Sequence, residues 1–299
     1  MKILLLGKNG QVGWELQRSL MPLGEVIALD RMQCDLSHPE TISAIVRNIK
    51  PDIIVNAAAY TAVDKAEEDE ALANMINATS VGLLAEEAKK LNALFVHYST
   101  DYVFDGTKKA PYTEDDAPNP INAYGRTKLS GEKAIIKSGC DYLVLRTTWV
   151  YAARGSNFLK TMLRLAQERE EMRVVADQYG APTWARNIAD VTAHTLIAAQ
   201  KERQVSGFVS NIYHLSASGK TTWHGFAGAI IEHARQLALP ENIKTERVLP
   251  IATKEYPLPA TRPENSQIDS SSLETHFGIV LPEWRDAMAL CLNELLEAQ

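Results

Sequence analysis

The chain has 299 residues, of which 45% are hydrophobic and 23% charged, and its formal net charge is −6. These values lie near the average of folded globular proteins and exclude the disordered and fibrous classes. Because the charge is negative and no basic cluster stands out, we expect no nucleic-acid partner. No apolar run reaches the roughly 18 residues that a membrane span needs.

The opening residues, MKILLLG, do not resemble a signal peptide, because the apolar run ends without a cleavage site of small residues. The cysteines Cys34, Cys140 and Cys291 are scattered and lack the spacing of a zinc site or a redox disulfide. We therefore expect reduced packing residues and a cytoplasmic location.

The first predicted strand, residues 2–7, runs directly into GKNGQVG, and a helix is predicted over 11–20. Gly7, Gly10 and Gly13 fall in the turn and first helical turn, where a missing Cβ lets backbone N–H groups approach a pyrophosphate. The spacing is G-x-x-G-x-x-G and not the usual G-x-G-x-x-G. Its position between strand and helix still favours a dinucleotide site over a purely structural turn.

The second strand, residues 25–30, ends at Asp30, whose carboxylate could accept from adenine-ribose hydroxyls and so favour NAD(H). Arg31 follows, and a guanidinium could instead pair with the 2′-phosphate of NADP(H). The dipeptide therefore predicts tolerance of both cofactors, although it could also be a solvated charge pair. Asp35 lies where it could accept from the adenine amino group.

Further along the chain we predict a helix at 39–49, a strand at 52–58, a helix at 71–91 and a strand at 94–100. The small residues Ala57, Ala58 and Ala59 would suit a flat ligand, or simply close packing. The strand at 94–100 ends with Ser99 and Thr100, at the sheet edge where the nicotinamide would lie. Thr100 could hydrogen-bond a substrate oxygen, or merely cap backbone.

A helix predicted over 121–138 carries Tyr124 and Lys128, four residues apart and hence on one face. An ammonium so close should lower the phenol pKa from about 10 toward neutrality. Such a phenol would be a competent general acid for a carbonyl being reduced. The small neighbours Ala123, Gly125 and Thr127 would let this helix lie close to the sheet and cofactor.

The last regular strand is predicted at 142–148, and the strands are continuously apolar, as in sheets covered on both faces. The pattern predicts an α/β fold with a Rossmann-type doubly wound parallel sheet. We expect a dinucleotide-binding domain over 1–150, to which later segments return. Residues 151–299 should be mainly a smaller substrate-binding region, with ordered loops at 178–187 and 256–267.

Together these motifs resemble the extended short-chain dehydrogenase/reductase superfamily. Within it, the chain is most similar to the reductases that complete dTDP-L-rhamnose synthesis. The similarity runs nearly end to end, through GKNGQVGWELQ, DIIVNAAAYTAVDKAE, HYSTDYVFDG, AYGRTK, RTTWVYA, QYGAPT and YPLPATRPENS.

The resemblance implies an NADPH- or NADH-dependent enzyme that reduces the C4′ keto group of a dTDP-sugar destined for cell-surface polysaccharide. Tyr124 would be the proton donor, Lys128 would hold the nicotinamide ribose and tune the phenol, and Thr100 would complete a catalytic trio. Further cofactor contacts are implied for Gly10, Gln11, Val12, Asp30, Asp35, Leu36, Val63, Asp64, Lys65 and Tyr102. Implied substrate contacts are Phe104, Asp105 and Trp149, to which we add Arg262 as a candidate for the diphosphate.

Some members of this superfamily are homodimers with Mg²⁺ held by interface glutamates. Glu15 and Glu294 match two such positions, but Arg186 stands at the third, and a cation there would repel a metal. We therefore expect no metal ligands, and a monomer and a homodimer remain equally plausible.

Two other functions fit the same scaffold. Non-catalytic members, such as the regulatory β subunit of methionine adenosyltransferase, bind a dinucleotide without turnover, but the intact Tyr, Lys and Thr set favours an enzyme. Sugar-nucleotide epimerases and dehydratases also share it. Dehydratases usually have Asp-Glu after the strand-end Thr, whereas here Asp101-Tyr102 supplies half of that pair.

Overall fold

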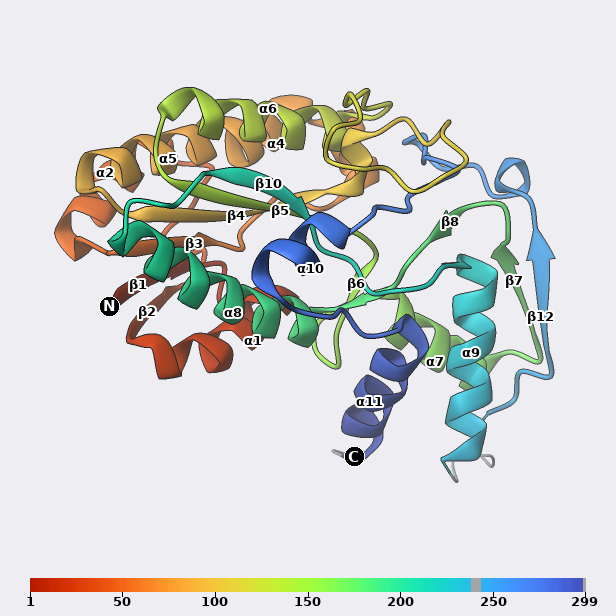
Figure 1. The fold of residues 1–299 in the computed structure, drawn as a ribbon. Helices are drawn as coiled ribbons and strands as arrows, with labels where there is room; N and C mark the ends of the chain where they lie inside the picture. The colour runs from red at the N-terminus through yellow and green to blue at the C-terminus, as the bar shows by residue number, and fades with distance from the viewer. Residues whose placement is uncertain (238–242, 298–299) are drawn as a thin grey trace.

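A six-stranded sheet forms the centre of the computed structural model, which describes residues 1–237 and 243–297 (Figure 1). Every neighbouring pair of its strands is parallel, in the order β10-β5-β4-β3-β1-β2. The strands are β1 (Lys2–Leu6), β2 (Glu25–Leu29), β3 (Ile53–Asn56), β4 (Leu94–Thr100), β5 (Tyr142–Thr147) and β10 (Asn211–His214). The chain places β2 on one side of β1 and then places β3 on the other side. A ligand crevice is expected at this switch point, outside the carboxyl ends of β1 and β3.

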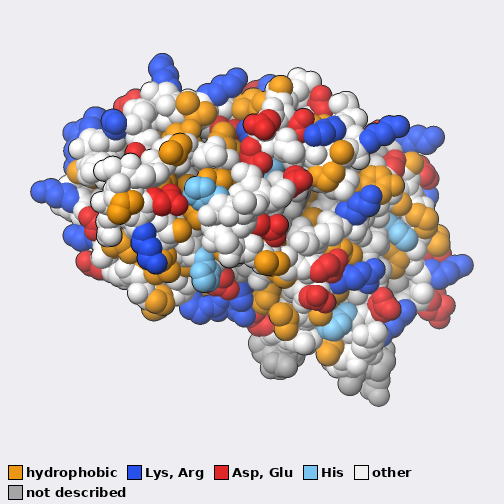
Figure 2. Space-filling model, in the orientation of Figure 1, with side chains coloured by type: hydrophobic (Ala, Val, Ile, Leu, Met, Phe, Trp, Pro, Cys, Tyr) orange, Lys and Arg blue, Asp and Glu red, His pale blue; other side chains and the backbone are white. Residues whose placement is uncertain are grey.

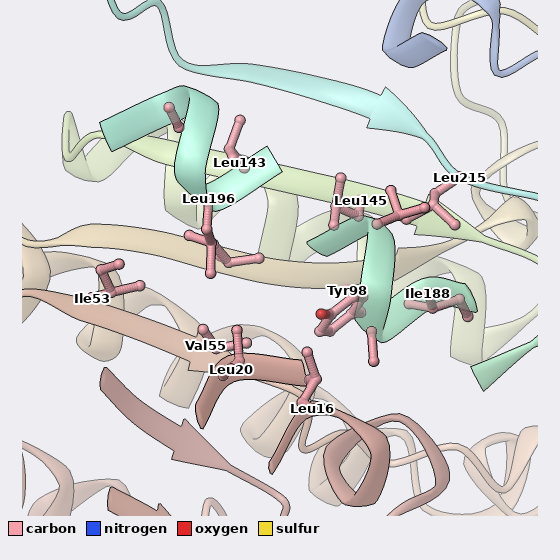
Figure 3. Packing of buried hydrophobic residues seen from close by; sticks show 14 of the residues in the cluster. Leu16, Leu20, Ile53, Val55, Tyr98, Leu143, Leu145, Ile188, Leu196 and Leu215 are labelled. Carbon is pink, nitrogen blue, oxygen red and sulfur yellow. The ribbon is translucent and has the colours of Figure 1, made fainter. Parts of the chain in front are cut away.

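Helices cover both faces of this sheet, so the predicted doubly wound fold is confirmed. One face carries α1 (Gln11–Leu20) and α8 (Ala185–Gln204), and the other carries α2 (Pro39–Ile49), α5 (Ser80–Leu91) and α6 (Ala123–Ser138). Figure 3 shows Leu16 and Leu20 of α1, with Leu196 of α8, packed toward sheet residues such as Val55 and Leu145. This face is held by burial of aliphatic side chains.

The helix predicted over 71–91 is not a single α-helix. After α3 (Val63–Glu68), the chain forms α4 (Glu70–Asn74), a π-helical turn η2 (Met75–Thr79) and then α5. The π turn places Asn77 against Tyr60, whose backbone N–H and carbonyl bond the Asn77 amide at 2.9 and 3.0 Å. Hydrophobic periodicity cannot reveal such a turn, because the long-range bonds of one asparagine stabilise it.

A second apolar core lies beside the sheet, around Phe226, Trp284 and Cys291. It is formed by α7 (Phe158–Glu168), α9 (Trp223–Gln236), α11 (Trp284–Glu297) and the parallel pair β7 (Glu171–Val175) and β12 (Arg247–Ile251). The remaining elements are β6 (Val150–Tyr151), β8 (Tyr179–Gly180), β9 (Thr183–Trp184), β11 (Thr221–Thr222), α10 (Ser271–Phe277), η1 (Met21–Leu23), η3 (Asp101–Val103) and η5 (Thr253–Glu255). Residues after 150 thus build this core. They also supply strand β10 to the sheet and helix α8 to one of its faces.

Positive and negative side chains are interspersed over the face drawn in Figure 2, and neither sign forms a continuous patch there. Among residues 1–237 and 243–297, no helix has both the length and the apolar character to cross a membrane.

Candidate active site

A cleft of about 850 Å³ opens along the carboxyl edge of the sheet. It gathers side chains from the glycine loop, the ends of β2, β3 and β4, the start of α6 and the segment 147–157. The predicted site residues that line it are Gly7, Gly10, Gln11, Val12, Asp30, Arg31, Asp35, Leu36, Ala57, Ala58, Ala59, Val63, Thr100, Tyr102, Tyr124, Lys128 and Trp149. Residues far apart in the sequence therefore meet in one cleft.

The glycine loop is shaped by close backbone contacts. Gly7 has φ +83, and a Cβ there would lie 2.7 Å from the backbone nitrogen of Ala58. A Cβ on Gly13 would lie 2.1 Å from the carbonyl oxygen of Gly7, so Gly13 seats α1 on the turn and does not line the cleft. Gly10 is the N-cap of α1 and lines the cleft, where a backbone-lined cradle fits a pyrophosphate at a helix N-terminus.

Two cations flank Asp30 at the end of β2. Lys8 Nζ lies 3.4 Å from the Asp30 carboxylate, and Arg31 donates from Nε to Asp35 at 3.0 Å. Lys8 was missed by the sequence interpretation, although it lies within the GKNG turn. Burial tends to raise the pKa of Asp35, but hydrogen bonds from Ser37 and Arg31 outweigh it and lower that pKa to about 2.

Thr100 and Asp101 lie beside Tyr124. Thr100 Oγ1 donates to Asp101 Oδ1 at 3.0 Å and accepts from the backbone N–H of Tyr102 at 3.2 Å, so it also caps η3. Burial raises the pKa of Asp101 to about 6. Burial also raises the pKa of Tyr124 to about 12, while its interaction with Thr100 acts in the opposite direction. The expected lowering of the phenol pKa is therefore wrong for this structure.

The reason lies in the position of Lys128. Its side chain is 1% exposed, and Nζ lies 2.6 Å from the Tyr98 carbonyl oxygen and 3.0 Å from His97 Nε2. Burial lowers the pKa of Lys128 to about 8, and no interaction with Lys128 contributes to the pKa of Tyr124. The helix face predicted from the spacing is present, but β4 holds the amine.

A small residue of α6 allows close approach to other backbone, but that backbone belongs to η3 and not to a strand of the sheet. A Cβ on Gly125 would lie 2.1 Å from the carbonyl oxygen of Tyr102. Ala123 and Thr127 are buried. Tyr102 in turn packs edge-on against Tyr124, with ring centroids 5.8 Å apart.

Several polar groups in the cleft wall have no hydrogen-bond partner among the described residues. Ser99 and Thr147 line the cleft, and their buried hydroxyl oxygens make no hydrogen bond within the described part of the chain. Buried hydroxyls normally find partners. The wall is therefore suited to a polar ligand, and together with the glycine cradle it fits a dinucleotide beside a second substrate.

Trp149 and Trp223 stack in the cleft with ring centroids 3.6 Å apart. Trp149 has φ +45, and a Cβ on Gly180 would lie 2.6 Å from its indole, so Gly180 provides the space for this ring. Trp223 begins α9 and was not singled out in the sequence, because nothing near it marks a site. The pair forms a flat apolar wall suited to a planar or ring-shaped group.

Some predicted contacts do not line the cleft. Phe104 is buried and stacks on Tyr112 at 4.3 Å between centroids, while Asp105 accepts from Tyr112 and Asn119. Hydrogen bonds from Thr107, then Asn119 and Tyr112, lower the pKa of Asp105. These side chains hold the segment after η3 together, and the sequence could not distinguish that role from substrate contact.

Asp64 was expected at the cofactor and Arg262 at the substrate diphosphate, but the two side chains form an ion pair with each other. Nη1 and Nη2 of Arg262 lie 2.6 Å from Oδ1 and Oδ2 of Asp64, respectively. This bond with Arg262 lowers the pKa of Asp64. The pair joins α3 to the loop at 256–267, and neither residue lines the cleft; Lys65 beside it is exposed.

The third predicted position of a metal site holds a guanidinium within the same chain. Arg186 donates to Glu15 at 3.3 Å and to Glu294 at 2.7 Å. Within the described residues, no group of three His, Cys, Asp or Glu side chains gathers that could hold a metal ion. The arginine lies where a divalent cation would have to bind both carboxylates, so these residues do not fit Mg²⁺.

Comparison with known proteins gives consistent relatives. The family model described as the RmlD substrate binding domain matches residues 1–297. A dTDP-4-dehydrorhamnose reductase of Burkholderia thailandensis is 56% identical over 296 residues, covering 99% of each chain. One of Escherichia coli strain K12 is 50% identical over 299 residues, covering 99% of this chain and 98% of the relative.

Solved structures agree with these relatives. A dTDP-4-dehydrorhamnose reductase from Bacillus anthracis, in complex with NADP, superimposes with a TM-score of 0.88 at 35% identity, covering 98% of this chain and 99% of that one. A UDP-glucose 4-epimerase from Thermus thermophilus, in complex with NAD, has a TM-score of 0.81 at 18% identity, which shows a shared fold alone.

Proposed function

The chain belongs to the RmlD family of dTDP-4-dehydrorhamnose reductases, and from this membership we propose that it converts dTDP-4-dehydro-L-rhamnose to dTDP-L-rhamnose. One observation carries the proposal: Thr100, Tyr124 and Lys128 line the same cleft as the glycine loop. A proton donor and a nicotinamide site would therefore meet at one end of a dinucleotide cradle.

The reduced nicotinamide, when bound, supplies a hydride to the C4′ carbon. Tyr124 supplies the proton for the C4′ oxygen, and because burial raises its pKa to about 12, the phenol stays protonated until it reacts. Thr100 orients the same oxygen and, with Lys128 in its ammonium form, stabilises the phenolate left behind. Trp149 and Trp223 form the wall against which the sugar nucleotide packs.

We propose that both NADH and NADPH are accepted. Asp30 can accept from ribose hydroxyls, while Lys8 and Arg31 offer cations beside it for a 2′-phosphate. The backbone at Gly7, Gly10 and Val12 would approach the diphosphate, and Ala57, Ala58 and Ala59 would lie along the middle of the cofactor.

The product would supply rhamnose for cell-surface polysaccharide such as the O antigen of lipopolysaccharide. A Bacillus subtilis relative, 36% identical and named spore coat polysaccharide biosynthesis protein SpsK, supports a role of this kind. We place the protein in the cytoplasm, since its three cysteines are buried free thiols, as is usual in a reducing compartment. A monomer or a homodimer stays a prediction.

The test is direct. Mixing the protein with NADPH and dTDP-4-dehydro-L-rhamnose should give a steady loss of nicotinamide absorbance. Tyr124→Phe should lower kcat by about 10²–10⁴-fold, the usual contribution of a positioned general acid, while the dissociation constant for NADPH changes little.

The outcomes separate the alternatives. NADPH binding without oxidation would favour the non-catalytic binding subunit. Undiminished oxidation in Tyr124→Phe would remove the acid role from Tyr124. Formation of a dehydrated or epimerised sugar without net cofactor oxidation would favour the dehydratase or epimerase alternative.

A further inference from the structure

His97 lies behind the cleft on β4, the strand that also carries Thr100. Its side chain is 1% exposed, and each ring nitrogen has one polar neighbour. Nδ1 lies 3.2 Å from Asn56 Nδ2, and Nε2 lies 3.0 Å from Lys128 Nζ. The proposed reaction gives this ring no role, yet it contacts the amine on which the reaction depends.

The amide of Asn56 determines which nitrogen of His97 carries the proton. Asn56 Oδ1 accepts from the backbone N–H of Ala58 at 3.1 Å, so the Asn56 NH₂ group faces the ring and donates. Nδ1 of His97 accepts that bond, and the proton of the neutral ring is therefore on Nε2. A flipped amide would set the NH₂ group of Asn56 against the N–H of Ala58.

Because Nε2–H donates, Lys128 must offer a lone pair. An ammonium has three donors and no acceptor. A neutral amine can accept from His97 and still donate to the Tyr98 carbonyl oxygen at 2.6 Å. The hydrogen bonds around Lys128 are thus those of a neutral amine.

We propose that His97 is a positioning residue that favours the neutral amine of Lys128 in the free protein, and that dinucleotide binding releases this amine and so favours its protonation. The step is one proton taken from water onto Nζ, and no other bond forms or breaks. The inference rests on the proposed function, since Lys128 must meet the ribose hydroxyls and Tyr124 in the complex. At alkaline pH, where the free protein holds mainly the neutral amine, Tyr124 gains its cationic neighbour when the cofactor binds.

The groups around Lys128 have pKa values well away from its own, so Lys128 is the group among them that changes its charge between pH 7 and pH 9. Burial lowers the pKa of Lys128 to about 8, and burial, then Lys128, lowers that of His97 well below its ordinary value. Burial raises the pKa of Tyr124 to about 12, that of Asp101 to about 6 and that of Tyr98 above its ordinary value. The nearby carboxylate of Glu132 accepts from Nε and Nη2 of Arg146 at 2.9 and 2.7 Å.

The experiment is calorimetric titration of the full chain with NADH, in buffers of different ionisation enthalpy, at pH 7 and pH 9. NADH lacks the 2′-phosphate, which itself titrates near pH 6 in a phosphate ester. We expect uptake close to one proton per bound NADH at pH 9 and a small fraction at pH 7. The affinity should fall with rising pH above about 8, by up to about tenfold per pH unit.

Three variants give the readout its meaning. Lys128→Met should abolish the proton uptake at pH 9. His97→Gln should reduce it by more than half and flatten the pH dependence of KM for NADH, because a glutamine oxygen accepts from an ammonium. His214→Gln, at another buried histidine that does not line the cleft, should keep the uptake of the unmodified protein.

Binding of NADH at pH 9 without proton uptake would overturn this inference and leave the dinucleotide function intact, as would uptake that persists in Lys128→Met. Failure to bind both NADH and NADPH would refute the proposed function and the inference with it. If His97→Gln does not fold, the pH series and Lys128→Met still decide.

Discussion

The side-chain carboxyl group of Asp101 is buried in the folded protein. It is 3% exposed, and its Oδ1 atom accepts a hydrogen bond from the Thr100 hydroxyl. Its Oδ2 atom makes no hydrogen bond to the described residues. Burial raises its pKa from 3.8 to about 6. The folded protein therefore binds this proton more tightly than the unfolded chain, and ionisation of Asp101 near neutral pH opposes folding.

We expect Asp101→Asn to stabilise the protein more at pH 7.5 than at pH 4.5. The stability contributed by the protonated group is complete below about pH 4 and is lost as pH rises through about 6. A shift of this size corresponds to roughly 3 kcal/mol. Urea unfolding at both pH values measures it. The exposed Asp115→Asn is the control, and an equal effect of Asp101→Asn at both pH values would contradict the pKa assignment.

For individual residues, the sequence predicted where the side chains lie better than it predicted their pKa values. Tyr124, Lys128 and Thr100 could be placed because helical spacing and a strand end determine where they lie. The pKa of Tyr124 could not, since it depends on burial and on the bonds that β4 makes to Lys128. Trp223 could not be found, because only the fold brings it against Trp149.

At the level of elements, five strands of the sheet were predicted to within two residues, because strands covered on both faces are continuously apolar. The sixth, β10, was missed since it is four residues long and lies in a part of the chain without clear alternation. The π turn at Met75–Thr79 was missed because it depends on the contact of Asn77 with Tyr60. Tertiary bonds of this kind leave no periodic signal.

The glycine loop allows two substitutions to be compared in one element. Gly13→Ala should lower the free energy of unfolding by about 1–3 kcal/mol, because its Cβ would lie 2.1 Å from the Gly7 carbonyl oxygen. Gly10→Ala should cost less than about 1 kcal/mol, since its nearest contact would be 3.3 Å.

Binding should follow a different order from stability. Gly10 lines the cleft, so a methyl group there should raise the dissociation constant for NADPH more than tenfold in a protein that remains folded. Chemical denaturation and fluorescence titration of the two variants measure both quantities. Equal losses of stability would show that the close contact of Gly13 is relieved by movement of α1.

Across the whole molecule, Arg186 joins elements that are distant in the sequence. Its guanidinium lies between Glu15 of α1 and Glu294 of α11. The guanidinium carbon also lies over the Trp184 ring, 4.9 Å from the ring centroid. A positive charge here neutralises two carboxylates, of which Glu15 is buried. Removing that charge would leave Glu294 without this partner and Glu15 paired with Arg18 alone, at 2.7 Å.

We expect Arg186→Glu to make stability depend on a divalent cation. Three carboxylates would then face one another, and millimolar Mg²⁺ or Ca²⁺ should raise the melting temperature of this variant, whereas EDTA should leave that of the unmodified protein unchanged. Differential scanning fluorimetry measures both. Arg186→Gln is the matched control, and a cation response equal to that of Arg186→Glu would argue against binding at the new carboxylate cluster.

The late position of α8 in the chain also matters during synthesis. Five strands of the sheet lie within residues 2–147, but α8, which covers one face with α1, spans Ala185–Gln204. Until it emerges from the ribosome, apolar sheet residues such as Leu143 and Leu145 lack the part of their cover that α8 supplies, and Tyr98 lacks its bond to Thr192. A nascent chain paused between residues 150 and 185 therefore holds the proposed catalytic residues on an open, aggregation-prone sheet, and this is the stage at which chaperones would matter most.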